Sequence, residues 1–135
     1  MKRKILIVDD DEMLCEELAE ILTGEDYSVD TAFDGQKGLA AARKARYDLI
    51  LLDIKMPRMN GFEFLQELKR GATTSKVLVL SANHSVNAFL GDTVDIPEDY
   101  SQKILALAEG VMNKPYDVEV LLSRIRTLLA EPRVS

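Results

Sequence analysis

The chain is poor in cysteine and has no long apolar run. Its single cysteine, Cys15, cannot form an internal disulfide, which is typical of proteins in the reducing cytoplasm. We interpret this thiol, which lies among helix-spaced residues, as a packing residue. No apolar run approaches the roughly 20 residues of a membrane-spanning helix. The apolar segment 5–8 is cut off by three aspartates, too early for a signal peptide. We therefore expect a cytoplasmic protein without a membrane segment.

The chain also lacks a basic stripe. Its net charge is -6, and its lysines and arginines are scattered along the sequence. Because direct nucleic-acid binding usually needs clustered positive charge, we expect none by this domain. No internal repeat, low-complexity tract or linker divides the 135 residues, which predicts one domain over residues 1–135. Residues 131–135 are either a frayed end or the start of a linker to a further domain.

Strands are the clearest elements in the sequence. The uninterrupted aliphatic run 49–52 predicts a strand buried on both faces, as in the centre of a parallel sheet. Residues 5–8 and 77–80 have the same character. Residues 27–31 alternate between apolar and polar, which indicates an edge strand, and residues 111–112 predict a short fifth strand.

Helical spacing of apolar residues separates these strands. The expected helices run from Glu12 to Gly24, from Gly35 to Arg46, around Phe62–Leu68 up to Gly71, from Pro97 through Leu107, and over Val118–Leu129. Strands that alternate with helices imply parallel pairing and right-handed crossovers. The fold class is therefore α/β, with a doubly wound five-stranded parallel sheet in the order 2-1-3-4-5.

Polar residues of reactive types follow the predicted strands. Asp9 and Asp10 follow the first strand, Asp53 ends the third, Ser81 follows the fourth and Lys114 closes the fifth. Carboxyl ends of parallel strands meet at one edge of the sheet, where open α/β sheets bind ligands. Such acids also occur as helix caps or as solvated loop residues, so each one alone says little.

Together these residues favour phosphoryl transfer. Three crowded carboxylates repel one another and keep their charge only beside a cation. Oxygen ligands without histidine or cysteine favour Mg²⁺. Asp53 would then be the nucleophile that becomes an acyl phosphate. The Ser81 hydroxyl can donate to one phosphoryl oxygen, and the Lys114 ammonium can pair with another.

Four motifs carry a resemblance to a known family. Taken in order, the segments Val8–Asp11, Asp53–Gly61, Ser81–Ala82 and Lys114–Pro115 resemble the receiver domain of two-component response regulators. The resemblance is spread over residues 4–130. It implies the flavodoxin-like (α/β)5 receiver fold of chemotaxis-type receivers.

The resemblance implies a role for each acid. Asp53 resembles the phosphoacceptor. Asp10 and Asp53 resemble direct magnesium ligands, and Asp9 resembles a ligand acting through water. The backbone carbonyl of Lys55 would fill a further position on the metal.

The resemblance also implies the phosphate-binding and switch residues. Ser81, beside Ala82, resembles the switch hydroxyl, and Lys114 resembles the phosphate-pairing lysine. The bond before Pro115 would be cis. The phosphodonor would be a sensor histidine kinase or a phosphotransfer protein, and the output would be a conformational shift that controls a downstream protein or an output domain. Homodimer formation stays open.

The sequence departs from the family pattern in two places. Val111 stands where the family usually has an aromatic switch residue, which puts the usual readout in doubt. The separation of Ser81 and Lys114 is longer than usual, and the extra residues fall in segment 83–97, a functional insert or a surface elaboration. Lys55 and Asn83 occupy positions that tune dephosphorylation in the family, and we expect slow loss of the phosphoryl group. His84 we interpret as a solvated loop residue.

Three other classes of protein share part of this pattern. A magnesium-dependent phosphohydrolase of the haloacid dehalogenase type would have Asp-x-Asp, but Lys55 stands at the second position. A flavodoxin would need a Ser/Thr/Gly phosphate loop after the first strand, where residues 9–12 are all acidic. A pseudo-receiver that acts only by protein contact is the main alternative. We therefore expect a phosphoacceptor and not a turnover enzyme.

Overall fold

The computed structural model describes residues 2–53, 61–71, 74–82, 107–114 and 116–130, and at positions 61–62, 81–82 and 113–114 it describes the backbone alone. The elements in chain order are β1 (Lys4–Val8), α1 (Glu12–Gly24), β2 (Ser28–Ala32), α2 (Gly35–Lys44), β3 (Leu49–Asp53), α3 (Gly61–Arg70), β4 (Lys76–Ala82), β5 (Gly110–Lys114) and α6 (Val118–Ala130). The expectations for segment 83–97, and for a helix over residues 97–106, lie outside the described residues.

The five strands form one parallel sheet. Their order is β2-β1-β3-β4-β5, which confirms the predicted fold class and order. Strand β3 is buried along its whole length, and β1 is buried after its first residue. Only the last residue of β2 is fully buried, as its edge position requires. The apolar patterns therefore predicted correctly which strands are central.

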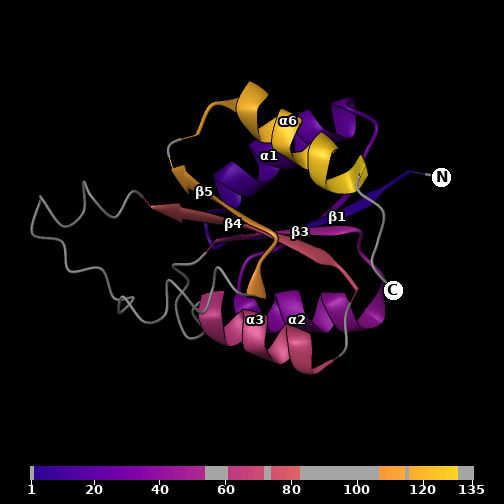
Figure 1. Ribbon diagram of the computed structural model, residues 1–135, viewed down its shortest axis with the longest axis vertical. Coiled ribbons are helices and arrows are strands. Elements are labelled where there is room, and N and C mark those ends of the chain that lie inside the picture. The colour runs from indigo at the N-terminus through magenta and orange to yellow at the C-terminus, as the bar shows by residue number, and fades with distance from the viewer. Residues whose placement is uncertain (1, 54–60, 72–73, 83–106, 115, 131–135) are drawn as a thin grey trace, which may run out of the picture.

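Helices cover both faces of the sheet. Helices α1 and α6 lie together on one face, and α2 and α3 lie on the other (Figure 1). Successive strand residues point to opposite faces, so Leu6 packs with α2 and α3 whereas Ile7 packs with α1 and α6. The core thus has two layers, one on each face of the sheet, and the ends of the strands lie between these layers.

Aspartates begin three of the helices. Asp11 accepts a hydrogen bond from the Leu14 amide at 3.1 Å, and Asp34 accepts one from the Lys37 amide at 2.8 Å. Asp117 accepts from the Glu119 amide at 2.8 Å. These carboxylates satisfy amides that have no partner within the helix.

Some element ends differ from the sequence prediction. Helix α2 ends at Lys44, two residues early, because Ala45 has an extended backbone. Strand β5 extends from Gly110 to Lys114, since pairing with β4 uses backbone groups and continues past the apolar pair. In α3 the fully buried aromatic side chain is Phe64, which the spacing argument had not selected.

No helix in the described ranges is both long and apolar enough to span a membrane.

Candidate metal centre at the carboxyl edge of the sheet

Three aspartates come together where β1 and β3 end. The two strands are neighbours, and Val8 pairs with Leu52, so the residues that follow these two lie at the same height. Those residues are Asp9 and Asp53. Asp10 is the next residue of the chain after β1. The sheet order, which the apolar runs predicted, and the register of β1 with β3 thus account for this meeting of residues more than 40 positions apart.

The carboxylates of Asp9, Asp10 and Asp53 are close enough to share one ion. One oxygen from each lies within 4.8 Å of the other two. Asp9 is 2% exposed and Asp53 is 6% exposed, whereas Asp10 is open to solvent. Two of the three acids are thus shielded from solvent, and the third is accessible. The structure therefore brings together the three acids that the sequence predicted.

Several hydrogen bonds hold Asp9 in place. Its amide donates to the carbonyl of Ala32 in β2 at 3.1 Å. Its Oδ1 accepts from the Asp11 amide at 3.0 Å, and its carbonyl accepts from Sγ of Cys15 at 3.3 Å. The acids of this run therefore have different roles. Asp11 caps helix α1, whereas Asp9 and Asp10 belong to the cluster.

The donor set has a clear chemical preference. Three carboxylates at this spacing repel one another, and a hard divalent cation removes the repulsion. Among the residues that the structure describes, the cluster contains carboxylate oxygens and none of the imidazole or thiolate ligands that Zn²⁺ favours. The residues present therefore fit a hard cation such as Mg²⁺.

The backbones of β4 and β5 reach the same edge. Asp53 pairs with Leu80, and Ser81 is the next residue of β4. Ala82 pairs with Lys114 at the end of β5. The register therefore places the Ser81, Ala82 and Lys114 backbones beyond Asp53, on the two strands next in order. The other predicted site residues, Lys55, Asn83 and Pro115, lie outside the described residues.

The atypical position Val111 is part of the sheet. It pairs with Val79, is partly buried, and packs against the core layer beneath α2 and α3. Leu107 and Ala108 pack against the same layer. The short branched side chain of Val111 thus packs on the face of β5 that α2 and α3 cover.

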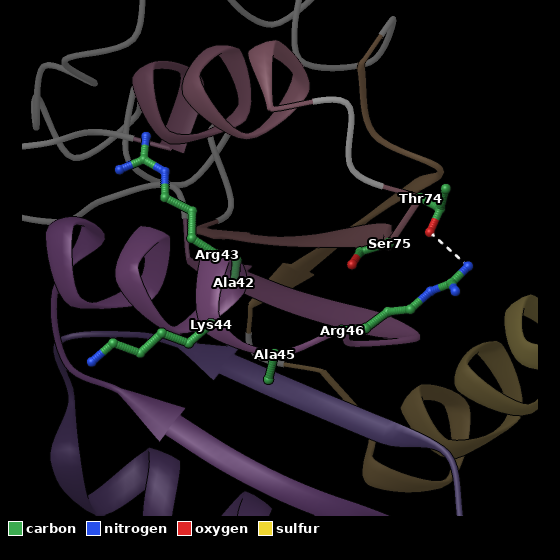
Figure 2. A pocket seen from close by; sticks show the side chains of 7 residues that line it. All are labelled: Ala42, Arg43, Lys44, Ala45, Arg46, Thr74 and Ser75. Carbon is green, nitrogen blue, oxygen red and sulfur yellow. Dashed lines mark hydrogen bonds between the residues drawn. The ribbon is translucent and has the colours of Figure 1, made fainter.

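A hollow of about 330 Å³ lies elsewhere, between the end of α2 and the start of β4. Figure 2 shows Arg46 reaching Thr74, to which it donates a hydrogen bond of 3.3 Å, while Arg43 and Lys44 extend from α2. Residues that precede β3 and β4 line the hollow, so it lies at the amino end of the strands. It is thus at the opposite end of the sheet from the three aspartates and is not part of their site.

Sequence reasoning missed the contact between Cys15 and Asp9. The interpretation of Cys15 as a packing residue is confirmed, because its side chain is fully buried in the core layer beneath α1 and α6. Its bond to a carbonyl of the acidic cluster was not foreseen. The available signal was its position in the first turn of the helix that directly follows the acids.

Fold and site together define a class of protein. The family model described as "Response regulator receiver domain" matches residues 5–126. The chain belongs to this family, the receiver domains of two-component response regulators.

Relatives of known name agree with this assignment. The chain is 36% identical over 126 residues to the response regulator ArlR of Staphylococcus aureus, a match that covers 93% of this chain and 52% of ArlR. The chain thus spans about half the length of the curated relatives it matches.

Solved receiver structures have the same fold. A CheY-like receiver domain protein from Methanospirillum hungatei has a TM-score of 0.82 at 28% identity, covering 96% of this chain and 94% of that one. Chemotaxis protein CheY4 of Vibrio cholerae has a TM-score of 0.77 at 30% identity, covering 95% and 99%. TrrA of Thermotoga maritima, solved in complex with Mg(2+)-BeF, has a TM-score of 0.75 at 28% identity, covering 93% and 98%.

Proposed function

We propose that this chain accepts a phosphoryl group on Asp53, in a magnesium-dependent transfer from a sensor histidine kinase or a phosphotransfer protein. The modification shifts the chain between two conformations, and the shift controls a downstream protein or an output domain. The observation that carries the proposal is the convergence of the Asp9, Asp10 and Asp53 oxygens within 4.8 Å at the edge of the sheet. Family membership supports it.

Family membership suggests the role of each ligand. Asp10 and Asp53 would bind Mg²⁺ directly, Asp9 would bind through a water, and the backbone carbonyl of Lys55 would supply a further oxygen. Mg²⁺ usually keeps several waters and uses one or two carboxylates together with phosphate oxygens, so three acids are sufficient. When bound, the ion neutralises both the crowded carboxylates and the incoming phosphoryl oxygens. TrrA, a structural relative, was solved with Mg(2+)-BeF, which agrees with this assignment.

In the transfer step, an Asp53 carboxylate oxygen forms a bond to phosphorus. The bond from phosphorus to the imidazole nitrogen of the donor breaks, and its electron pair stays on that nitrogen, which takes up a proton. The Ser81 hydroxyl, beside Ala82, donates to one phosphoryl oxygen. The Lys114 ammonium pairs with another. The bond before Pro115 would be cis, as family membership suggests.

Release of the phosphoryl group is proposed to be slow. Lys55 stands where a haloacid dehalogenase-type hydrolase would carry its second aspartate, so the general acid of such an enzyme is missing from that position. Because Lys55 and Asn83 occupy positions that tune dephosphorylation in the family, we expect each chain to accept one phosphoryl group and to keep it, in contrast to a turnover enzyme.

The test is incubation with acetyl phosphate and MgCl2, followed by intact mass spectrometry. We expect one phosphoryl adduct on the parent, no adduct on Asp53→Asn, and no adduct without Mg²⁺. Asp26→Asn is the matched control, because this exposed acid lies far from the cluster, and asparagine tolerates its positive φ of 71°. This variant should be modified like the parent.

Other outcomes would support the rivals. A parent that takes no phosphoryl group at saturating acetyl phosphate and Mg²⁺ would point to a pseudo-receiver that acts by protein contact. Multiple turnover of a free phosphomonoester would favour the phosphohydrolase. An adduct that persists on Asp53→Asn would move the acceptor to another residue.

A further inference from the structure

We infer that Cys15 is a positioning residue for the candidate metal centre: its thiol holds the backbone of Asp9, and thereby sets the affinity of the site for Mg²⁺. The inference rests on the proposed function, because it assigns Asp9 to the metal. It concerns a residue of the packed core that the proposed chemistry does not use. Cys15 is also the only cysteine in the chain.

The geometry supports more than a filling role. Cys15 is fully buried, and its Sγ lies 3.3 Å from the carbonyl oxygen of Asp9, within the range of a thiol hydrogen bond. The amide of Cys15 donates to the Asp11 carbonyl at 3.0 Å, so the first turn of α1 fixes where the thiol lies. The turn that begins the helix and the acid that ends β1 are thus tied together directly.

Asp9 is held from three directions. β2 accepts its amide through the Ala32 carbonyl, the Asp11 amide donates to its carboxylate, and Cys15 donates to its carbonyl. Strand β1 ends at Val8, and the Asp9 amide still bonds to the backbone of β2, so the bonds from Asp11 and Cys15 add to this one in setting the orientation of Asp9. A carboxylate fixed before the ion arrives loses less conformational entropy on binding, which raises the affinity.

The effect is expected to be modest because a thiol is a weak donor. Loss of a hydrogen bond of this strength corresponds to roughly a three- to fivefold change in an equilibrium constant. The same thiol also contributes apolar contacts to the layer beneath α1 and α6. An experiment must therefore separate the effect of the thiol hydrogen bond from the effect of the packed volume of the side chain.

Two variants make this separation. Cys15→Val keeps an apolar side chain of similar size but has no donor. Leu18→Ala, one turn further along the same face of α1, removes more buried volume at a residue that is 2% exposed. Each is titrated with MgCl2 while the Asp10 and Asp53 amides are followed by NMR, and each is unfolded in urea. If valine overpacks the site, Cys15→Ala replaces it.

We expect Cys15→Val to weaken Mg²⁺ binding roughly three- to fivefold with a small change in the urea midpoint. Leu18→Ala should lower the urea midpoint strongly and keep the affinity within about twofold of the parent. An unchanged affinity in Cys15→Val would reduce the thiol to a filler of space. Equal weakening in both variants would attribute the loss to general loosening, and would also overturn the inference.

A readout without metal keeps the inference separate from the proposed function. In metal-free buffer, the Asp9 and Asp11 amides should exchange with solvent faster in Cys15→Val than in the parent, relative to the Ile7 amide of β1. A parent that binds no Mg²⁺ would refute the proposed function, and the exchange rates alone would then decide whether Cys15 holds Asp9. Unchanged exchange at both amides would contradict the holding role.

Discussion

Neutralising Asp53 should make the metal-free protein more stable. Asp53 and Asp9 are both shielded from solvent, and their ligand oxygens lie within 4.8 Å. Two unit charges at this distance repel by about 3.5 kcal/mol at an effective dielectric constant of about 20, and by about 1 kcal/mol in bulk water. Asparagine keeps the shape of the side chain and removes the charge. We therefore expect Asp53→Asn to raise the free energy of unfolding by about 1–3 kcal/mol in buffer with chelator.

Magnesium should remove this advantage. An ion that binds only the folded parent stabilises it by about 2.7 kcal/mol at a concentration one hundred times its dissociation constant. Asp53→Asn lacks one direct ligand and should gain much less. The two urea unfolding curves should therefore be separated in chelator, with the variant ahead, and should converge or change order in saturating MgCl2.

The assay is urea unfolding followed by far-UV circular dichroism, in chelator and in MgCl2, at matched ionic strength with NaCl so that general screening is equal. Asp26→Asn, which removes an exposed charge outside the cluster, should behave like the parent in both buffers. The reasoning fails if Asp53→Asn is no more stable than the parent in chelator. It also fails if Mg²⁺ stabilises both proteins equally.

Three further predictions concern other parts of the chain. Burial, followed by the hydrogen bond to Asp30, raises the pKa of Tyr47 from 10.0 to about 12. The contribution of the protonated phenol to stability is therefore complete below pH 10 and is lost as the pH rises to 12. Across this interval the parent should lose about 2–3 kcal/mol more of its free energy of unfolding than Tyr47→Phe, as measured by urea unfolding. Gly38→Ala should lower the free energy of unfolding by about 1–2 kcal/mol, because the added Cβ would lie 2.9 Å from side chains of β1 and α3. A Cβ at Gly24 would have no atom within 4 Å, so Gly24→Ala should be neutral or stabilising. Lys55→Asn should speed loss of the phosphoryl group, measured by intact mass over time; an unchanged rate would contradict the tuning role.

The sheet and the acidic cluster were predictable because both depend on pattern alone. The four aliphatic residues before Asp53 point alternately to the two faces of the sheet, so both faces must be covered to bury them. A strand of this kind lies in the centre of a sheet, as β3 does. When β1 and β3 are parallel neighbours in the sheet, the residues after β1 lie beside those at the end of β3. The chemistry of the site is therefore encoded in the positions of Asp9, Asp10 and Asp53 relative to the apolar runs.

Other contacts depend on side-chain direction, which no pattern records. Helical spacing allows more than one apolar residue of α3 to face the sheet, and it did not select Phe64. The hydrogen bond of 2.6 Å from Tyr47 to Asp30 joins a residue just before β3 to the edge strand β2. The bond from Cys15 to Asp9 likewise needs the angle at which α1 leaves the sheet. Such contacts follow from the packed structure and could not be derived from spacing.

The two ends of the sheet are built in different ways, and this has a consequence for signalling. At the amino end, opposite charges and neutral groups meet: Arg3 forms an ion pair with Asp48 at 3.6 Å, and the Ser75 hydroxyl donates to the Tyr47 carbonyl. At the carboxyl end, the three carboxylates of Asp9, Asp10 and Asp53 are gathered, so we expect a cation or a phosphoryl group to change the electrostatic energy mainly there and much less at the amino end.

We expect a change at the carboxyl end to reach the rest of the molecule through β4 and β5. Val111 pairs with Val79 and packs on the core, and its side chain has no ring to rotate between buried and exposed positions. We therefore expect phosphorylation to be transmitted by displacement of the β5 backbone and of the partly buried Leu107 and Ala108 that precede it. In amide NMR, this mechanism places the largest shifts on phosphorylation along residues 107–112, with small shifts at Tyr47 and Asp48. Equal shifts at both ends of the sheet would show that the two ends are coupled after all.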